Sequence, residues 1–111
     1  MFKGAGGNFS SGNDLNNFAR EEAATMDAKL VSQTMADVLM VLTEAIMKSK
    51  KPIFALVEGR AVGFAFTQLA LYDKVFATEN SFFMAPLVKI AQGPEMASSY
   101  LFPKIFGQSL A

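Results

Sequence analysis

An apolar segment of five residues, Ile53–Val57, lies between Pro52 and the pair Glu58-Gly59. A short run without polar side chains that is bounded by turn residues is typical of a strand buried on both faces. Such strands belong to parallel sheets, in which helices connect the strands and cover the sheet. With 111 residues, the chain is long enough for one globular domain or part of one. We therefore expect an α/β fold built on a parallel sheet.

A long helix is expected before this strand. No proline or glycine occurs between Leu15 and Ser49. Within that interval, apolar side chains recur at offsets of three and four, at Leu30, Val31, Met35, Val38, Leu39, Leu42 and Ile46. The pattern predicts an amphipathic helix from about Glu21 to Met47. Three lysines follow where cations suit the helix dipole, and Pro52 stops the helix.

The remaining segments alternate between strand and helix patterns. The opening from Met1 to Asp14 is rich in glycine, serine and asparagine, so we expect a loop that leaves a strand missing from this sequence. Downstream, the expected elements are a turn at Gly59–Gly63, a helix near Phe64–Leu71, a strand at Lys74–Ala77, a short stretch at Phe82–Met84, and a helix that opens at Pro94-Glu95. Strands that alternate with helices at this spacing support the α/β assignment.

The composition excludes several kinds of site. Cysteine and histidine are both absent, so the chain has no thiol nucleophile, disulfide, Cys/His zinc site or histidine base. Catalysis would have to use carboxylates, lysines, hydroxyls or backbone groups, and we expect no metal centre. Ten Lys and Arg residues balance ten Asp and Glu residues. We expect no nucleic-acid partner, because no overall field attracts a polyanion.

The most apolar window, residues 53–72, has the length of a bilayer span. Glu58, Arg60 and Gln68 lie inside it, and two glycines interrupt it. These residues suit a buried strand, a turn and a helix better, so we expect a soluble protein with no membrane partner. Residues 1–9 contain no apolar core, so we also expect no signal peptide.

Two glycine-containing turns are candidates for anion binding. The segments Ser10–Leu15 and Gly59–Phe64 each end just before a helical pattern resumes, so each can present unpaired backbone N–H groups. Two such donors would make an oxyanion hole. The alternative is that Gly12 and Gly63 only permit tight turns and that Asp14 only caps a helix.

Glu95 is the carboxylate most suited to catalysis. The other acids decorate the long helix, lie in turns or flank apolar elements, which is typical of solvated surface groups. Glu95 instead follows Pro94 at the expected first turn of a helix, among apolar neighbours such as Leu87 and Ile90. The alternative is that Glu95 only complements the helix dipole.

Three stretches together resemble the crotonase, or enoyl-CoA hydratase/isomerase, superfamily. They are SSGNDL at 10–15, KPIFALVEGRAVGFAF at 51–66 and QGPEMASSYLFPKIFG at 92–107, in the family's order and at its separations. Within the superfamily they are most similar to peroxisomal-type enoyl-CoA delta isomerases. The resemblance implies that residues 1–111 form part of a crotonase-like domain with a ββα spiral. The opening strands and the C-terminal helices of that domain would lie outside this sequence.

The resemblance also implies roles for individual residues. The backbone N–H groups of Asn13 and Phe64 would form the oxyanion hole, and Glu95 would be the isomerase base. Hydratases place two carboxylates where this chain has Thr67 and Leu87. The expected activity is therefore to move a 3-enoyl-CoA double bond to the 2-trans position during β-oxidation of unsaturated fatty acids. The residues expected to contact acyl-CoA are Ser11, Gly12, Asn13, Asp14 and Leu15.

The same resemblance implies further properties. The partner would be an acyl-CoA substrate, with no cofactor besides the coenzyme A that belongs to it. A full-length domain would form a homotrimer in a peroxisome or mitochondrion. Two departures from the family pattern are Arg60, near the expected acyl-CoA entrance, and Met96, where the family has glycine. The alternative function is a non-catalytic, truncated crotonase-like chain that binds acyl-CoA or another partner without turnover.

Overall fold

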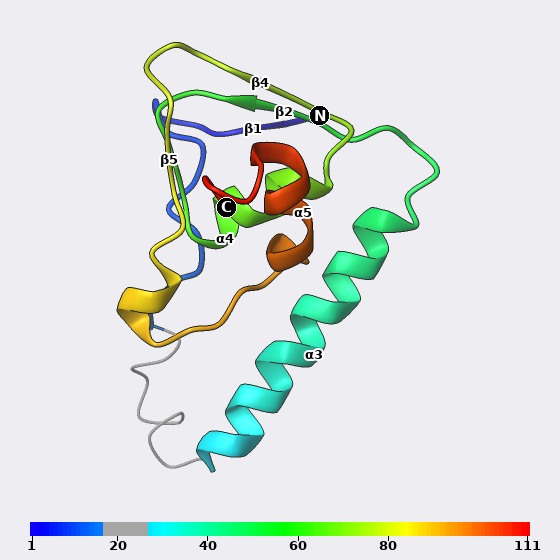
Figure 1. Ribbon diagram of the computed structural model, residues 1–111, viewed down its shortest axis with the longest axis vertical. Helices are drawn as coiled ribbons and strands as arrows, with labels where there is room; N and C mark the ends of the chain where they lie inside the picture. Colours follow the sequence, from blue (N-terminus) through cyan, green and yellow to red (C-terminus); the bar gives the residue numbers. More distant parts are fainter. Residues whose placement is uncertain (17–26) are drawn as a thin grey trace.

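The computed structural model describes residues 1–16 and 27–111 of the chain (Figure 1). One sheet has three strands in the order β1-β2-β4, and a second sheet pairs β3 with β5. Every neighbouring pair of strands is parallel. The predicted parallel α/β architecture is therefore confirmed. The strands are β1 (Phe2–Lys3), β2 (Phe54–Val57), β3 (Arg60–Val62), β4 (Lys74–Ala77) and β5 (Phe82–Met84).

The helical elements follow the strands in the alternation that the sequence predicts. The predicted helix at 64–71 divides into an α-helical turn and a 3-10 turn, and its outer bounds are as predicted. Figure 1 shows α3 running along one side of the molecule, away from the sheet formed by β1, β2 and β4. The helices are α3 (Ala28–Met47), α4 (Phe64–Thr67) and α5 (Ser98–Phe106), with 3-10 turns η1 (Gln68–Leu71) and η2 (Leu87–Ile90).

Three sequence predictions about the strands are wrong. The opening loop does not lack its strand, because Phe2–Lys3 pairs with β2. The predicted turn at 59–63 contains strand β3, because Arg60–Val62 pairs in register with Phe82–Met84. Strand β2 is not buried on both faces: Ala55 and Val57 are buried, whereas Phe54 is 38% exposed. The predicted strand β4 has the predicted bounds, and the short stretch expected at 82–84 forms strand β5.

Helix α3 ends at Met47 as predicted but begins at Ala28. Asp27 stands before it with a ψ of 119°, and its side chain accepts a hydrogen bond from the Lys29 N–H at 2.9 Å. An aspartate in that position is a favoured N-cap, so the prediction of one helix running through residue 27 is wrong. The part of the prediction that falls on residues 21–26 lies outside the described residues.

Only a narrow stripe of α3 faces the rest of the chain. Val31, Met35, Leu39 and Ile46 are half-buried, whereas Leu30 and Val38 are more than half exposed. By length and composition alone, the window Lys29–Met47 could cross a membrane, with a mean hydropathy of 1.4. That criterion also fits core helices, so the absence of a membrane partner stays a prediction.

A small core joins the two sheets to the helices. Ala55 and Val57 of β2 pack with Ala61 of β3 and Leu69 of η1, and all four are at most 5% exposed. Phe66 of α4 extends the contact to α5, because its ring centroid lies 4.9 Å from that of Phe102. The ends of β3 and β5 and the starts of α4 and α5 are thereby held around one centre.

Candidate active site

Strand β3 brings the two predicted anion-binding turns side by side. The Ser10 carbonyl accepts from the Val62 N–H at 3.1 Å, and Ser10 forms a parallel bridge with Ala61. At Gly12, where φ is +89°, an added Cβ would lie 2.5 Å from the Val62 oxygen and 3.4 Å from the Phe64 nitrogen. Only glycine allows the loop to approach β3 this closely.

The backbone around Phe64 is arranged to leave an amide available. The Gly63 N–H donates to the Met84 carbonyl at 2.7 Å, and φ at Gly63 is +59°. Helix α4 then begins at Phe64. The Phe64 N–H is the first in the helix, so no helical carbonyl one turn earlier can accept a hydrogen bond from it. Asn13 and Phe64 both line one cavity of about 100 Å³, as the oxyanion-hole prediction requires; the donor role of their amides stays a prediction.

Glu95 lines the same cavity as Asn13 and Phe64. It is the single carboxylate among the described residues that do so, and it is 7% exposed. The structure therefore brings together the three groups that the resemblance singled out. They come from three separate stretches of the sequence, and the chain path through β3, β5 and η2 places them around one small volume.

The local backbone of Glu95 differs from the prediction. Helix α5 begins at Ser98, so Glu95 lies before the helix and not in its first turn. Met96 and Ala97 have φ values of 53° and 56°, in the left-handed region that non-glycine residues rarely adopt. The turn that these two residues form is closed by a hydrogen bond from the Ser98 N–H to the Glu95 carbonyl at 2.9 Å. The predicted placement of Glu95 in the first turn of a helix is therefore wrong.

Both carboxylate oxygens of Glu95 accept hydrogen bonds. The Thr67 hydroxyl lies 3.3 Å from Oε1, and the Gln92 amide nitrogen lies 3.0 Å from Oε2. Burial raises the pKa of Glu95 above its ordinary value, and the two hydrogen bonds oppose that rise without cancelling it. A carboxylate with a raised pKa is a stronger base when it is ionised, which suits the removal of a carbon-bound proton.

The two positions where the resemblance expects carboxylates in a hydratase hold side chains that cannot exchange a proton in that way. Leu87 is buried and lines the small cavity. Thr67 is fully buried and touches Glu95. Sequence reasoning missed the contacts that Thr67 and Gln92 make with Glu95. The three-residue spacing of Gln92 and Glu95 could have suggested the contact between these two side chains. Thr67 is 28 residues from Glu95 in the sequence, so no local pattern indicates its contact.

A larger groove adjoins the small cavity. It has a volume of about 620 Å³ and runs between α3 and the segment 90–95. Val31, Met35 and Leu39 form its α3 wall, and Ile90 and Pro94 lie opposite. Leu15, Ile90, Gln92 and Glu95 line both spaces, so the carboxylate lies where the groove meets the cavity.

The predicted acyl-CoA residues occupy one loop at the cavity. Ser11 and Leu15 line it with Asn13, and Gly12 lies beside the Phe64 nitrogen. Asp14 is exposed, and its carboxylate accepts from the Asn16 N–H at 2.9 Å, as the capping alternative predicts. Their contact with coenzyme A stays a prediction.

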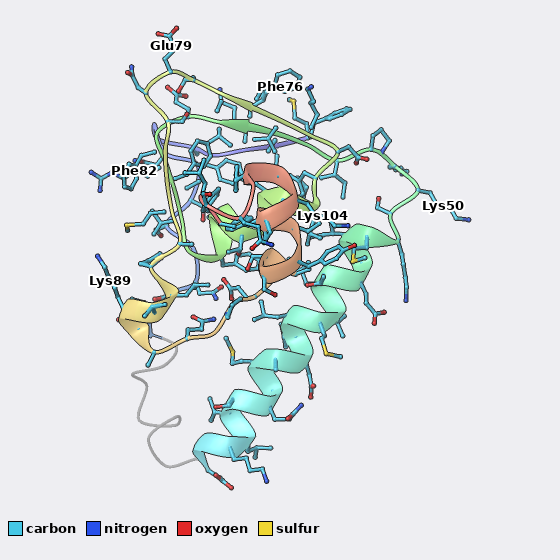
Figure 2. The ribbon with its side chains drawn as sticks, viewed as in Figure 1. Lys50, Phe76, Glu79, Phe82, Lys89 and Lys104 are labelled. Atoms are coloured by element: carbon cyan, nitrogen blue, oxygen red, sulfur yellow. The ribbon has the colours of Figure 1, made fainter. Side chains whose placement is uncertain are left out.

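The two departures from the family pattern point away from the small cavity. The Arg60 guanidinium carbon lies 5.9 Å from the ring centroid of Phe82, on the outer side of β5 (Figure 2). Met96 is 3% exposed, and its sulfur accepts from the Thr43 hydroxyl of α3 at 3.3 Å. Among the described residues, neither side chain lines the cavity that holds Glu95.

Comparison with known proteins agrees with this arrangement. The sequence matches the family described as Enoyl-CoA hydratase/isomerase over residues 1–111. It is 40% identical over its full length to enoyl-CoA delta isomerase 3, peroxisomal, of Mus musculus, and 39% identical to enoyl-CoA delta isomerase 2 of Rattus norvegicus. These alignments cover 34% and 28% of the two relatives, so the chain spans about a third of their length.

Solved structures give the same assignment. An enoyl-CoA hydratase from Polaromonas sp. JS666 superposes with a TM-score of 0.82 at 25% sequence identity. The match covers 97% of this chain and 41% of that one. The predicted fold class, a partial crotonase-like domain, is thus confirmed. The chain belongs to the enoyl-CoA hydratase/isomerase family.

Proposed function

We propose that this chain holds the catalytic centre of an isomerase that moves the double bond of a 3-enoyl-CoA to the 2-trans position. The observation that carries the proposal is that Glu95 is the single carboxylate among the described residues lining the cavity that Asn13 and Phe64 also line. One base beside two candidate amide donors is the minimum equipment for a 1,3-proton shift through an enolate.

The reaction then proceeds in two proton transfers. The Glu95 carboxylate takes a proton from C2, the C2–H electron pair moves into the conjugated system, and negative charge collects on the thioester oxygen. The Asn13 and Phe64 amides stabilise that oxygen, and one such donor contributes about 3 kcal/mol to the lowering of a barrier. The protonated Glu95 returns the proton to C4, which leaves the double bond between C2 and C3. No atom is gained or lost.

Hydration is disfavoured by the same geometry. Adding water across the 2,3 bond needs a base for the water and an acid for C2, which hydratases supply with two carboxylates. Leu87 has no titratable group, and the single proton of the Thr67 hydroxyl already has two acceptors within reach, Glu95 and the Phe64 carbonyl. A water molecule in this cavity would have Glu95 as its sole carboxylate base among the described lining residues.

The apolar groove fits the acyl part of such a substrate. With C2 to C4 at Glu95, the chain beyond C4 would extend along Val31, Met35 and Leu39. The loop at 11–15 would contact the coenzyme A part. The substrate brings its own coenzyme A, so the proposal includes no further cofactor. The setting is β-oxidation of unsaturated acyl chains in peroxisomes or mitochondria, and the complete domain is a homotrimer.

The test is a product assay on the purified chain. With a 3-enoyl-CoA we expect the conjugated 2-trans product, which absorbs near the thioester band. With a 2-enoyl-CoA we expect no 3-hydroxyacyl-CoA at a comparable rate. Hydration as fast as isomerisation would contradict the assignment.

The second candidate is binding without turnover. Its support is the apolar surface of α3, where Val38 is 57% and Val41 is 70% exposed. A chain that presents such a surface can serve as an interaction module. Saturable acyl-CoA binding by the purified chain, with no turnover of either substrate, would favour this candidate over the isomerase.

A further inference from the structure

The Thr67 hydroxyl lies between two acceptors. Its oxygen is 3.2 Å from the Phe64 carbonyl and 3.3 Å from Oε1 of Glu95. A hydroxyl has one proton, so it can donate to only one of these oxygens at a time. Both distances exceed the ~2.8 Å that is typical of an O–H···O bond, so neither acceptor holds the proton in a short bond.

The better acceptor depends on the charge of Glu95. An ionised carboxylate accepts a stronger hydrogen bond than a neutral amide carbonyl. When Glu95 gains a proton it loses this advantage, and the Phe64 carbonyl can compete for the Thr67 proton. Thr67 is 0% exposed. A hydroxyl with no access to solvent is costly to leave unbonded, so the second acceptor keeps it satisfied in both states.

We propose that Thr67 is a positioning residue for Glu95. The Thr67 hydroxyl donates its hydrogen bond to the Glu95 carboxylate while Glu95 is ionised, and it turns to donate to the Phe64 carbonyl each time Glu95 is protonated. The inference rests on the proposed function, in which Glu95 is the base. No covalent bond of Thr67 breaks: the hydroxyl rotates about its C–O bond. While Glu95 is ionised, the Thr67 hydroxyl fixes the position of Oε1. While Glu95 is protonated, the rotation gives the Thr67 hydroxyl another acceptor, so its donor is not left unbonded.

The surroundings leave Thr67 and Gln92 as the main partners of this carboxylate. Helix α4 carries no titratable side chain. Of the charged or titratable groups on neighbouring elements, Glu44 alone shares a hollow with Glu95, and it is exposed and paired with Lys48 at 2.7 Å. The others are all exposed: Lys29, Asp37 and Lys48 on α3, Asp14 in the loop, Arg60 on β3, Lys89 on η2, and Tyr100 and Lys104 on α5.

A carbon-13 NMR titration tests the proposal without requiring turnover. With labelled glutamate carboxyls and phenylalanine carbonyls, the Phe64 carbonyl resonance should titrate with the same midpoint as Glu95. The Phe54 carbonyl, which also precedes an alanine, is the internal control and should not follow that midpoint. In Glu95→Gln and in Thr67→Val, the Phe64 response should vanish. In Thr67→Val the Glu95 midpoint should also move to higher pH, because the anion loses a donor.

The conservative variant separates positioning from simple packing. Thr67→Ser keeps the hydroxyl and should keep the Phe64 response. A Phe64 resonance that ignores the Glu95 titration in the wild-type protein overturns the proposal, even if Thr67→Val fails to fold. A response that persists in Thr67→Val overturns it too. Absence of isomerisation would instead refute the proposed function, which is read from a separate assay.

Turnover gives an independent readout. Thr67→Val should lower kcat about tenfold on the high-pH plateau with KM unchanged, since a ~1.4 kcal/mol loss corresponds to that factor. Thr67→Ser should stay within about threefold of the wild type. Thr34→Val is the matched control, because the Thr34 hydroxyl also bonds a helix carbonyl, that of Leu30 at 2.9 Å, far from Glu95 in the sequence. A plateau in Thr67→Val equal to the wild type would overturn the positioning role.

Discussion

Replacing Glu95 with glutamine should remove isomerase activity while leaving the fold intact. The two side chains have nearly the same shape, so the buried volume does not change. Thr67 can still donate to the new amide oxygen, and the Gln92 amide can turn to offer its own oxygen to the new NH₂ group. Only the capacity to take a proton is lost.

The expected loss of turnover follows from the absence of a substitute base. No other carboxylate occurs among the described residues that line the cavity. Thr67 and Gln92, which touch Glu95, cannot accept a proton at neutral pH. We therefore expect kcat to fall by at least about a hundredfold, or ~2.7 kcal/mol of barrier, with acyl-CoA affinity retained.

Glu95→Gln should lower turnover without lowering the free energy of unfolding. Burial raises the pKa of Glu95 in the folded chain, so the folded state binds this proton more tightly than the unfolded state. The free energy of unfolding then falls as pH rises from the ordinary glutamate pKa through the raised folded pKa. Glu95→Gln lacks this slope. At neutral pH the inactive variant should be at least as stable as the wild type.

The assay pairs 3-enoyl-CoA turnover with urea unfolding at several pH values. Glu79→Gln is the control, because Glu79 lies at the turn between β4 and β5 and points away from the molecule (Figure 2). It should change kcat by less than about twofold, as expected for a surface substitution. A folded Glu95→Gln protein with near-normal turnover would falsify the assigned mechanism and favour binding without catalysis.

Three further substitutions, two of them paired with a control substitution, test other parts of the site. Gly12→Ala should lower the free energy of unfolding in urea by about 2 kcal/mol or more and abolish turnover, because φ at Gly12 is +89° and the added Cβ would lie 2.5 Å from a carbonyl oxygen. Gly6→Ala is its control: φ at Gly6 is +74° but the surrounding space is open, so this substitution should cost less stability and spare turnover. Met96→Gly should destabilise the chain, because losing a buried methionine costs about 2–5 kcal/mol whereas relief of a left-handed backbone returns about 1–2. Ala97 is the exposed neighbour of Met96 and has φ 56°, so Ala97→Gly should instead be neutral or stabilising by up to about 1 kcal/mol. A Met96→Gly chain that is more stable than the Ala97→Gly chain would refute this reasoning. Met35→Trp should fill the groove and raise KM for long-chain but not short-chain 3-enoyl-CoA esters; equal effects on both would remove the groove as the acyl site.

The elements that sequence patterns predicted well are those with local causes. Strands β4 and β5 are short apolar runs between turn residues, and α3 ends at Met47 just before the lysines and Pro52. Strand β3 was missed because Arg60–Val62 lies between two glycines and looks like a turn. Its pairing depends on β5, about twenty residues later in the chain, and no local pattern records that partner.

The site was predicted in the same uneven way. Family motifs identified Asn13, Phe64 and Glu95, and the structure places all three around one cavity. The backbone of Glu95 was not predicted, because Met96 and Ala97 occupy left-handed conformations that their side chains do not favour. The partners of the carboxylate were also missed, since Thr67 meets it only through tertiary folding.

The smaller sheet explains why these groups meet. On one side of β3, the Arg60 carbonyl accepts the Phe9 and Ser10 N–H groups at 3.0 Å each, which fixes the loop that leads to Asn13. On its other side β3 pairs with β5, and the Gly63 N–H bonds the Met84 carbonyl where Phe64 begins. The chain leaving β5 then passes through η2 to Glu95. Because both proposed oxyanion amides and the proposed base depend on this one strand, a change that displaces β3 should abolish oxyanion stabilisation and proton transfer together, whereas Glu95→Gln should remove proton transfer alone.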